Sequence, residues 1–324
     1  MNFCTYFDSK YISFGFSLLE SLNKNYNDEG IYVLCLDHVT LTLTNKFYPK
    51  VNTIALSEIE SVYKNLLTIK PQRPKTEYIW TLTPHLIEYL ISYENLDFIT
   101  YLDSDQYFFG SPEPIINEVR HHSISILPHR FKKSIKHLEV YGLYNVSWVS
   151  MKNDSNSIEA LRWWRERCIE NCSVDIEKGI VGDQRYLNEF KSRFVSVHDI
   201  RNKSCGVAPW NYDVSTPIIL YHFQSLRMIN SFFFTYNHSE YNCNLSNRKL
   251  NNIYRSFINT VLNKYSLLNE YNAQKRNNKL VFAIDMKSIC TNDFIFVYKS
   301  FFLIFNFHKI IQLISFFKKV IRIR

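Results

Sequence analysis

Two aspartates separated by one residue, Asp103 and Asp105, directly follow the apolar run at 98–102. In an extended chain, residues two positions apart point the same way, so both carboxylates can face one ion. Hard oxygen ligands suit Mg²⁺ or Mn²⁺, and such an ion can bridge a diphosphate and offset charge on a leaving group. The pair therefore predicts a metal site for phosphate chemistry, although the same spacing also occurs in solvated turns and helix caps.

The segments around this pair alternate between strand-like and helix-like patterns over the first two-thirds of the chain. Short apolar runs divided by helical patterns indicate βαβ units and a largely parallel sheet. Ligands of open parallel sheets bind at the carboxyl ends of the strands, which is where the aspartate pair falls. We expect strands at 3–7, 31–36, 52–56, 98–102, 123–127, 146–151 and 218–223, and helices at 11–24, 76–92, 154–172, 182–190 and after Pro112 and Pro114.

Composition excludes two common nucleotide sites. The chain has 324 residues, of which 46% are hydrophobic, so it can bury a large core. It has only 7 glycines and contains neither G-x-G-x-x-G nor G-x-x-x-x-G-K-[ST], which argues against a Rossmann dinucleotide site and a P-loop. The cysteines number 7, and no secretory signal precedes the first strand, which favours a reducing, cytoplasmic compartment.

The segment 100–109, Thr-Tyr-Leu-Asp-Ser-Asp-Gln-Tyr-Phe-Phe, resembles the D-x-D signature of GT-A-fold glycosyltransferases. It is similar to the family 8-like group and to the bacterial nucleotide-diphospho-sugar transferases. Further segments agree with that group in the same order, at 3–5, 76–84, 128–131, 144–146, 163–168, 182–187, 208–211 and 221–223. The resemblance covers residues 1–226 and implies an α/β fold with a GT-A-type mixed, mostly parallel sheet and flanking helices.

The resemblance also implies roles for individual residues around the aspartate pair. His222 would be the third protein ligand of a Mn²⁺ or Mg²⁺ ion held by Asp103 and Asp105. Asp183 and Gln184 would lie beside the donor sugar, where a carboxylate can bind hydroxyls, act as a base or stabilise an oxocarbenium-like transition state. As an alternative, Asp183 follows a glycine and suits the N-cap of a helix.

Donor and acceptor contacts are expected from two further groups of residues. An aromatic ring can stack on sugar C–H groups, and an amide can bind hydroxyls, whereas solvated charge at a helix start or simple core packing is the alternative. The donor nucleotide would be bound by Phe3, Cys4, Thr5, Lys75, Trp80 and Ser104, and the sugar or acceptor by His129, Arg130, Asn145, Trp210 and Asn211. The family's H-x-x-G-x-x-K-P-W tail is missing after His222, which leaves the phosphate-binding cation open between Arg227 and Lys203.

Positive charge is concentrated at the C-terminal end of the sequence. The chain has a formal net charge of +8 and a pI of about 9.0, which favours an anionic partner. Residues 294–324 carry six basic residues and no acidic one, and at 100° per residue several basic and polar positions share one helical face. This pattern predicts a helix in an anionic membrane interface, with packing on the protein's own core as the alternative; nucleic acid is not expected as a partner.

The sequence thus predicts three regions: a GT-A-like domain at 1–235, a helical extension or linker at 236–293, and a basic amphipathic membrane-interface segment at 294–324. The expected function is a metal-dependent, retaining, hexosyltransferase-type glycosyltransferase. It would move a sugar from a nucleotide-diphosphate donor, a UDP-sugar, to a glycan or lipid-linked acceptor in cell-surface polysaccharide synthesis, peripherally at the inner face of the membrane. The alternatives are a catalytically inactive, membrane-associated binding protein of the same fold and a sugar nucleotidyltransferase, whose usual glycine-rich loop is missing.

Overall fold

The computed structural model describes residues 1–26, 30–236, 240–241, 243, 245–274, 293–298 and 301–305. The chain divides into two compact units, Met1–His222 and Phe223–Arg324. The three regions expected from the sequence remain a prediction.

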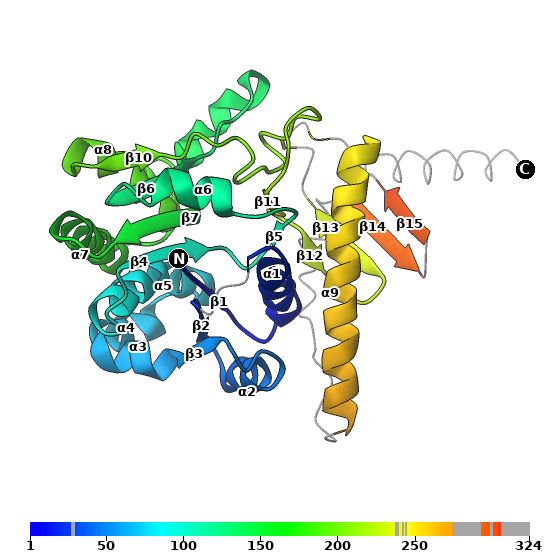
Figure 1. Ribbon diagram of the computed structural model, residues 1–324, viewed down its shortest axis with the longest axis horizontal. Helices are drawn as coiled ribbons and strands as arrows, with labels where there is room; N and C mark the ends of the chain where they lie inside the picture. The colour runs from blue at the N-terminus through cyan, green and yellow to red at the C-terminus, as the bar shows by residue number, and fades with distance from the viewer. Residues whose placement is uncertain are drawn as a thin grey trace, which may run out of the picture. The chain divides into compact units, whose positions relative to one another are not determined.

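A seven-stranded sheet forms the centre of the first unit (Figure 1). Its strands are β1 (Asn2–Phe7), β2 (Ile31–Cys35), β3 (Asn52–Ala55), β4 (Phe98–Leu102), β6 (Ile124–Pro128), β7 (Tyr144–Lys152) and β10 (Val197–Asp199). They lie in the order β10-β6-β7-β4-β1-β2-β3. Strand β7 runs antiparallel to β4 and β6, and the other neighbouring pairs are parallel. The predicted mixed, mostly parallel sheet is confirmed.

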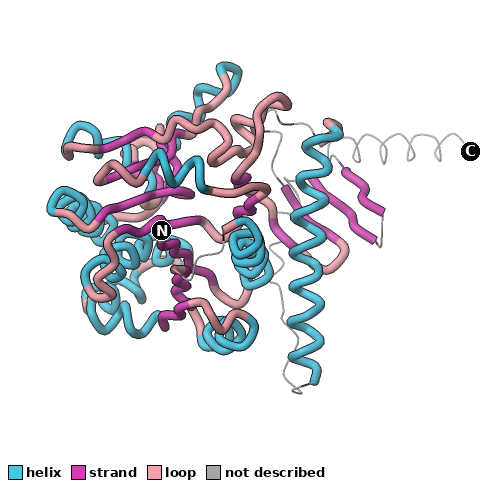
Figure 2. Tube along the Cα trace, in the orientation of Figure 1, coloured by secondary structure: helices cyan, strands magenta, loops and turns pink. Residues whose placement is uncertain are grey.

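Helices cover the sheet (Figure 2), and alternation along β1 shows which helices pack on which face. Cys4 joins the core cluster that the sheet shares with α5 (Lys75–Ser92) and α7 (Ser155–Glu170). The neighbouring Phe7 points the other way, toward α1 (Ile12–Asn25). A Cβ atom at Gly15 of α1 would lie 2.4 Å from the Phe7 ring, so only glycine lets this helix approach the sheet so closely.

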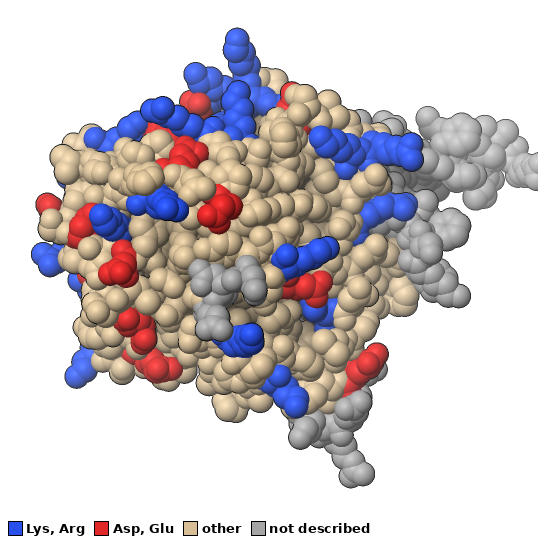
Figure 3. Space-filling model, viewed as in Figure 1, with Lys and Arg blue, Asp and Glu red and all other residues tan. Residues whose placement is uncertain are grey.

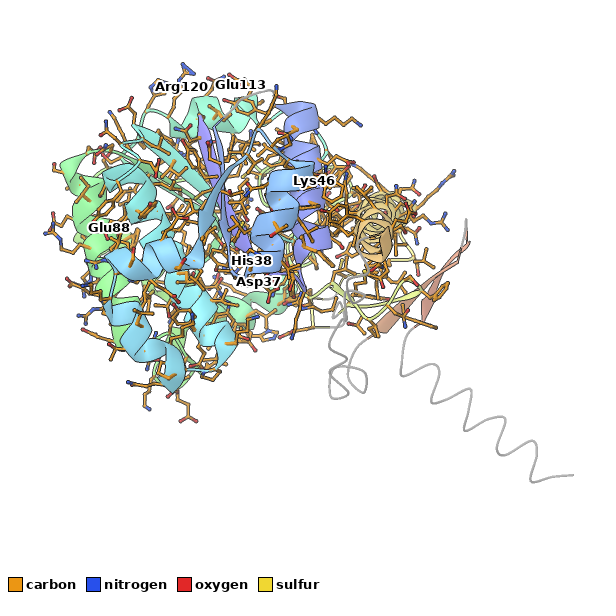
Figure 4. The ribbon with its side chains drawn as sticks, turned by 90° about the horizontal axis from the view of Figure 1, so that it is seen from below. Asp37, His38, Lys46, Glu88, Glu113 and Arg120 are labelled. Carbon is orange, nitrogen blue, oxygen red and sulfur yellow. The ribbon has the colours of Figure 1, made fainter. Side chains whose placement is uncertain are left out.

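The remaining helices of the first unit are short. They are α2 (His38–Phe47), α3 (Leu56–Val62), α4 (Asn65–Ile69), η1 (Lys70–Gln72), α6 (Glu113–Val119), η2 (Lys133–Tyr141), η3 (Gln184–Glu189) and α8 (Phe190–Arg193), and β8 (Val174–Asp175) pairs with β9 (Ile180–Val181). The Asp37 carboxylate caps α2 by accepting from the Thr40 amide at 2.8 Å and also accepts from the Ser9 amide at 2.9 Å. Figure 4 labels Asp37 and His38 at the start of α2 and Lys46 near its end. The Asp37 side chain therefore links the segment that follows β1, at Ser9, to the start of α2, which follows β2.

Two predicted helices differ in detail from the sequence expectation. Helix α7 ends at Glu170, two residues before the predicted end at 172. The short helix expected at 182–190 is a 3₁₀ turn, η3, followed by α8. Helices α2, α3 and α4 were not predicted.

A two-stranded ribbon at the edge of the first unit brings distant parts of the chain together. Strand β5 (Gln106–Phe108) follows the aspartate pair and runs antiparallel to β11 (Leu220–His222). The register places His222 opposite Gln106. The His222 amide donates to the carbonyl of Val207 at 2.8 Å, so both edges of β11 are held. The late strand expected at 218–223 is confirmed in a shorter form.

The second unit contains β12 (Arg227–Met228), β13 (Phe233–Tyr236), α9 (Arg248–Gln274), β14 (Asp293–Tyr298) and β15 (Phe301–Phe305). The four strands form an antiparallel sheet in the order β12-β13-β14-β15. Helix α9 lies within the range 236–293, where a helical extension or linker was expected. The helix predicted for 294–324 is wrong over 294–298 and 301–305, where aromatic and β-branched residues form paired strands. Its predicted basic helical face, at 309–322, lies outside the described residues.

Surface charge is mixed on the face shown in Figure 3, where lysine and arginine side chains lie among acidic ones. Several basic side chains gather at the top of that view. In the described part of the chain, no helix combines the length and the apolar character needed to cross a membrane.

Candidate metal and donor site

Three potential metal ligands meet at the carboxyl edge of the central sheet. Asp103 directly follows β4, Asp105 directly precedes β5, and His222 ends β11. Nε2 of His222 lies 3.1 Å from Oδ1 of Asp105 and 3.8 Å from Oδ2 of Asp103. One ligand atom from each residue lies within 4.8 Å of the other two. The three side chains that the sequence and the resemblance single out are therefore brought together.

The electrostatics of this cluster fit a bound cation. His222 is 2% exposed and Asp105 is 8% exposed, whereas the Asp103 side chain is 29% exposed. Burial, together with the nearby Asp105 carboxylate, raises the pKa of Asp103 to about 6, against the opposing effect of His222. A divalent cation relieves the repulsion between two crowded carboxylates. Two oxygen donors with one imidazole nitrogen suit Mn²⁺ or Mg²⁺. The residues present fit the metal that the fold implies.

Trp210 supports His222 from the buried side. The two rings meet edge to face, with centroids 5.6 Å apart at an interplanar angle of 85°. The indole N–H of Trp210 donates to the backbone carbonyl of His129 at 2.8 Å, and Trp210 is only 3% exposed. A ring so buried offers no open face to a sugar, so the expected stacking role of Trp210 is not supported. Its contacts instead fix the orientation of His222.

Asn211 and Arg130 are also committed to the protein's own backbone. The Asn211 amide donates to the carbonyls of His129 and Gly206 and accepts from the Ala208 amide. The Arg130 guanidinium donates to the carbonyls of Asn202 and Cys205. These contacts hold the loop between β10 and β11 against the end of β6. They explain both residues by local structure, and direct contact with a sugar or acceptor remains a prediction.

Asp183 is a buried residue that follows a glycine packed against α5. It is 6% exposed, and burial raises its pKa to about 7. The preceding Gly182 has a φ of +56°, and a Cβ atom there would lie 3.1 Å from the Trp80 ring. The Trp80 ring therefore packs against the backbone next to Asp183. The charge of Asp103 also raises the Asp183 pKa. Asp183 occupies the N-cap position of η3, as the alternative expected, but its side chain makes no capping hydrogen bond.

Gln184, Asn145 and His129 form one hydrogen-bonded group. The Asn145 amide nitrogen lies 3.1 Å from Nε2 of His129 and donates to the Gln184 side-chain oxygen at 3.3 Å. The Gln184 amide nitrogen donates to the carbonyl of Tyr141 at 3.0 Å. Burial lowers the pKa of His129 to about 3, so its imidazole is neutral. The structure thus joins these three predicted residues in a neutral network beside Asp183.

The expected nucleotide contacts at the first strand need a correction. Strand β1 continues to Phe7, so the segment 3–5 lies within the strand and not at its carboxyl end. Phe3 is packed against Trp148 in the core, and Cys4 is fully buried. The polar group at the strand end is Asp8, which the sequence analysis missed, although it is the first charged residue after the apolar run.

Lys75 and Ser104 do lie at the edge that carries the metal cluster. Nζ of Lys75, at the start of α5, is 2.5 Å from Oδ2 of Asp8, and its side chain is 62% exposed. Ser104 lies in the turn between the two aspartates and is half-buried. Arg73, two residues before α5, instead donates to the last carbonyls of α7, at Cys168 and Ile169. The donor-binding role of Lys75, Trp80 and Ser104 therefore remains a prediction that their positions allow.

Comparison with known sequences identifies two relatives, both uncharacterised proteins of Bacillus subtilis strain 168. YfnF is 29% identical over 251 residues, covering 70% of this chain and 82% of YfnF. YfnD is 29% identical over 230 residues, covering 65% of this chain and 73% of YfnD. No family model matches the chain. The two matches span 70% and 65% of this chain. Because both relatives are uncharacterised, they indicate no activity.

Comparison of folds identifies glycosyltransferases. GlyE of Streptococcus pneumoniae TIGR4 matches with a TM-score of 0.51 and 14% identity, covering 86% of this chain and 64% of GlyE. Mouse xyloside xylosyltransferase 1 and the galactosyltransferase LgtC are further structural neighbours, with TM-scores of 0.47 and 0.45. The first unit, with its mixed sheet and its aspartate pair at the carboxyl edge, has the GT-A-type fold of glycosyltransferases.

Proposed function

We propose that this protein is a metal-dependent glycosyltransferase that takes a sugar from a nucleoside-diphosphate donor. The observation that carries the proposal is the convergence of Asp103, Asp105 and His222 at the carboxyl edge of a GT-A-type sheet. Ligands bind at this edge in open α/β sheets. A divalent ion held there would supply charge compensation for the donor diphosphate and for the leaving nucleoside diphosphate.

The chain's own residues supply the binding geometry around that ion. Asp103 and Asp105 project from the two ends of one short turn, and His222 closes the third side from β11. Lys75 would contact a phosphate, because its exposed ammonium group can leave Asp8 for a second anion at the same edge. Trp80 would line the donor pocket beside Gly182.

Asp183 and Gln184 would face the donor sugar. An ionised Asp183 can accept hydrogen bonds from sugar hydroxyls and stabilise positive charge that develops at the anomeric carbon. Gln184 is held by Asn145 and by the Tyr141 carbonyl, so its position is fixed before a donor binds. Because the side chain is already fixed, less free energy is needed to order it during the reaction than for a mobile side chain.

The finer assignment rests on the sequence resemblance. We infer a UDP-sugar donor, retention of the anomeric configuration, and a glycan or lipid-linked acceptor in cell-surface polysaccharide synthesis. The basic residues in 294–324 support a location of the protein at the cytoplasmic face of an anionic membrane. Sedimentation with anionic and with uncharged vesicles tests this membrane assignment. Equal binding to both kinds of vesicle would contradict it.

The decisive experiment measures donor hydrolysis and transfer with a panel of nucleotide-sugars and Mn²⁺. Asp105→Ala should lose at least 100-fold in rate, on the scale of about 10²–10³ for removing one transition-state-stabilising group. The matched control is Asp97→Ala, an exposed aspartate just before the opposite end of β4. Full activity of Asp105→Ala would sink the metal assignment. Metal-dependent nucleotide binding without turnover of any donor would favour a binding protein.

A further inference from the structure

A carboxylate of α6 holds the start of the loop between β10 and β11. Oε1 of Glu118 accepts from the Arg201 amide, and Oε2 accepts from the Asn202 amide at 3.0 Å. Nε2 of His198, in the middle of β10, lies 2.8 Å from the same Oε1 atom. Burial acts to raise the pKa of Glu118, but these hydrogen bonds outweigh burial and lower the pKa, so the carboxylate is ionised at neutral pH. Hydrogen bonds to an ionised acceptor are strong, and Glu118 therefore fixes the chain just after β10.

A guanidinium binds the same loop from the end of β6. Arg130 donates to the carbonyl of Asn202 at 3.1 Å and to the carbonyl of Cys205. Asn202 is thus bound through both of its backbone groups, by the Glu118 anion at its amide and by the Arg130 cation at its carbonyl. Arg130 also has a φ of +55°, which is unfavourable for a residue with a side chain. Such a conformation persists only where surrounding contacts enforce it, and the two carbonyl contacts of Arg130 are contacts of this kind.

The far end of this loop is hydrogen-bonded to β11. The carbonyl of Ser204 accepts from the Leu220 amide at 3.0 Å, and the Val207 amide donates to the carbonyl of Leu220 at 3.0 Å. The Val207 carbonyl then accepts from the His222 amide at 2.8 Å. The loop therefore borders β11 on the side opposite β5, and its position along the strand sets where the His222 side chain can lie.

We propose that Glu118 and Arg130 act together as positioning residues for the metal ligand His222. The two side chains hold residues 201–205 between an anion and a cation, an arrangement that we call the clamp. Among the described residues, their hydrogen bonds go to this loop and to His198, so they act on His222 only through the backbone. The clamp rests on the proposed function, because it takes His222 as a metal ligand. It also gives Arg130 a role different from the sugar or acceptor contact that the family resemblance implies.

Calorimetric titration of the full chain with Mn²⁺ alone tests the clamp. Glu118→Gln keeps the size of the side chain but leaves one oxygen to accept, and Arg130→Lys puts a single ammonium group in place of a planar, two-pronged donor. Each variant should weaken Mn²⁺ binding by about tenfold, the lower end of the range for outer groups that orient a metal ligand. An unchanged Kd in Glu118→Gln overturns the proposal.

The double variant shows whether the two residues act as one unit. Release at either end frees the same stretch of loop, so Glu118→Gln with Arg130→Lys should weaken Mn²⁺ binding by about tenfold and not by about 100-fold. Losses that multiply would mean two independent effects and would contradict the clamp. A higher KM for the acceptor in Arg130→Lys, with wild-type affinity for Mn²⁺, would assign Arg130 to the acceptor and also contradict it.

Asp154→Asn is the matched control. Asp154 also accepts a backbone amide, from Ser157 at 2.9 Å, and binds a second segment through Ser123 at 2.7 Å. It follows β7, whose last residues pair with the first residues of β4 and β6, so it lies at the edge of the sheet opposite the metal cluster. The control should lose stability, while its Kd for Mn²⁺ stays within about twofold of wild type, because distant sites act independently. Equal weakening of Mn²⁺ binding in Asp154→Asn and Glu118→Gln would show a general effect of stability and overturn the proposal.

A second measurement needs no metal. Amide hydrogen exchange reports the local opening of a segment separately from unfolding of the whole chain. Glu118→Gln should lose protection at the Leu220 and His222 amides relative to the other strands of the sheet, and Asp154→Asn should not. Protection that is retained at β11, or lost evenly over the sheet, overturns the proposal. If the wild-type chain binds no Mn²⁺ and β11 still loses protection in Glu118→Gln, the proposed function is contradicted and the clamp on β11 is supported.

Discussion

His222 lies opposite Gln106 in the β5–β11 ribbon, and this pairing brings its imidazole to within 3.1 Å of Asp105. Side chains alternate between the two faces of this short ribbon, so a slip of one residue would turn the His222 side chain to the other face. The contact of Val207 with the other edge of β11 opposes such a slip. The third ligand is therefore placed by strand register and not by a local motif.

Binding of Mn²⁺ should stabilise the protein through this cluster. A ligand present at 100 times its Kd adds about 2.7 kcal/mol to the free energy of unfolding. Thermal unfolding with and without Mn²⁺ checks this, and His222→Ala should abolish most of the metal-dependent rise in Tm. His137→Ala changes an exposed histidine of η2 and should keep the rise. An unchanged rise in His222→Ala would show that the ion binds elsewhere.

Trp210→Phe should weaken Mn²⁺ binding by roughly tenfold, because outer groups that orient a metal ligand contribute on that scale. Phenylalanine lacks the indole N–H that bonds to the His129 carbonyl, so its ring is free to turn against His222. Calorimetric titration with Mn²⁺ measures the effect. Trp163→Phe, on α7 among Tyr186 and Phe190, is the control and should bind the ion as wild type does. Equal affinity in the two variants would contradict the supporting role of Trp210.

Asp183 should make the metal-free protein less stable as pH rises from about 4 to about 7. Its native pKa is about 7, whereas an unfolded aspartate ionises near 3.9. Between these values the native state binds more protons than the unfolded state, so the stability contribution of this group falls with rising pH. A shift of about three units corresponds to roughly 4 kcal/mol in free energy.

Asp183→Asn removes this titration and tests the sign. Urea unfolding in EDTA should show a smaller loss of stability between about pH 4 and about pH 7, the range between the unfolded and the native pKa of Asp183. Asp175→Asn is the control, because Asp175 is half-buried near the surface and a hydrogen bond from Lys178 lowers its pKa. Parallel curves for wild type and Asp183→Asn would mean that Asp183 is ionised normally in the folded chain.

Gly206→Ala should destabilise the loop that carries Trp210. Gly206 has a φ of +63°, and an added Cβ would lie 2.2 Å from the Leu127 side chain. A positive φ costs an alanine roughly 1–2 kcal/mol, and overpacking adds about 1–3 kcal/mol. At Gly110 the nearest atom to an added Cβ lies 3.9 Å away, so Gly110→Ala should stay within about 0.5 kcal/mol of wild type. Chemical denaturation of both variants checks the difference.

The fold of the first unit was largely predictable because its strands are short apolar runs with clear boundaries. The run at 98–102 matches β4, and its position before Asp103 located the metal edge of the sheet. His222 came only from the family resemblance. Its approach to Asp105 depends on the long-range pairing of β5 with β11, which leaves no local periodicity in the sequence.

Other features depend on burial and pairing that residue types do not specify. Trp210 and Asn211 are common types in sugar sites, but their indole and amide groups bond to the protein's own backbone. The contact of Glu118 with Asn202 joins residues from α6 and the β10–β11 loop that no motif connects. The run at 301–305 suits either a buried helix or a strand by periodicity alone, and pairing with β14 decides for the strand.

The position of His222 at the last residue of the first unit also sets the order in which the site can be completed. During synthesis the N-terminal part of a domain leaves the ribosome first, so β4 and both aspartates emerge long before β11. A nascent chain therefore has two carboxylates and no third ligand until the final strand docks beside β5. Under the proposed function, full metal-binding capacity is consequently a marker of a finished domain, and shortened chains that lack β11 would lack it.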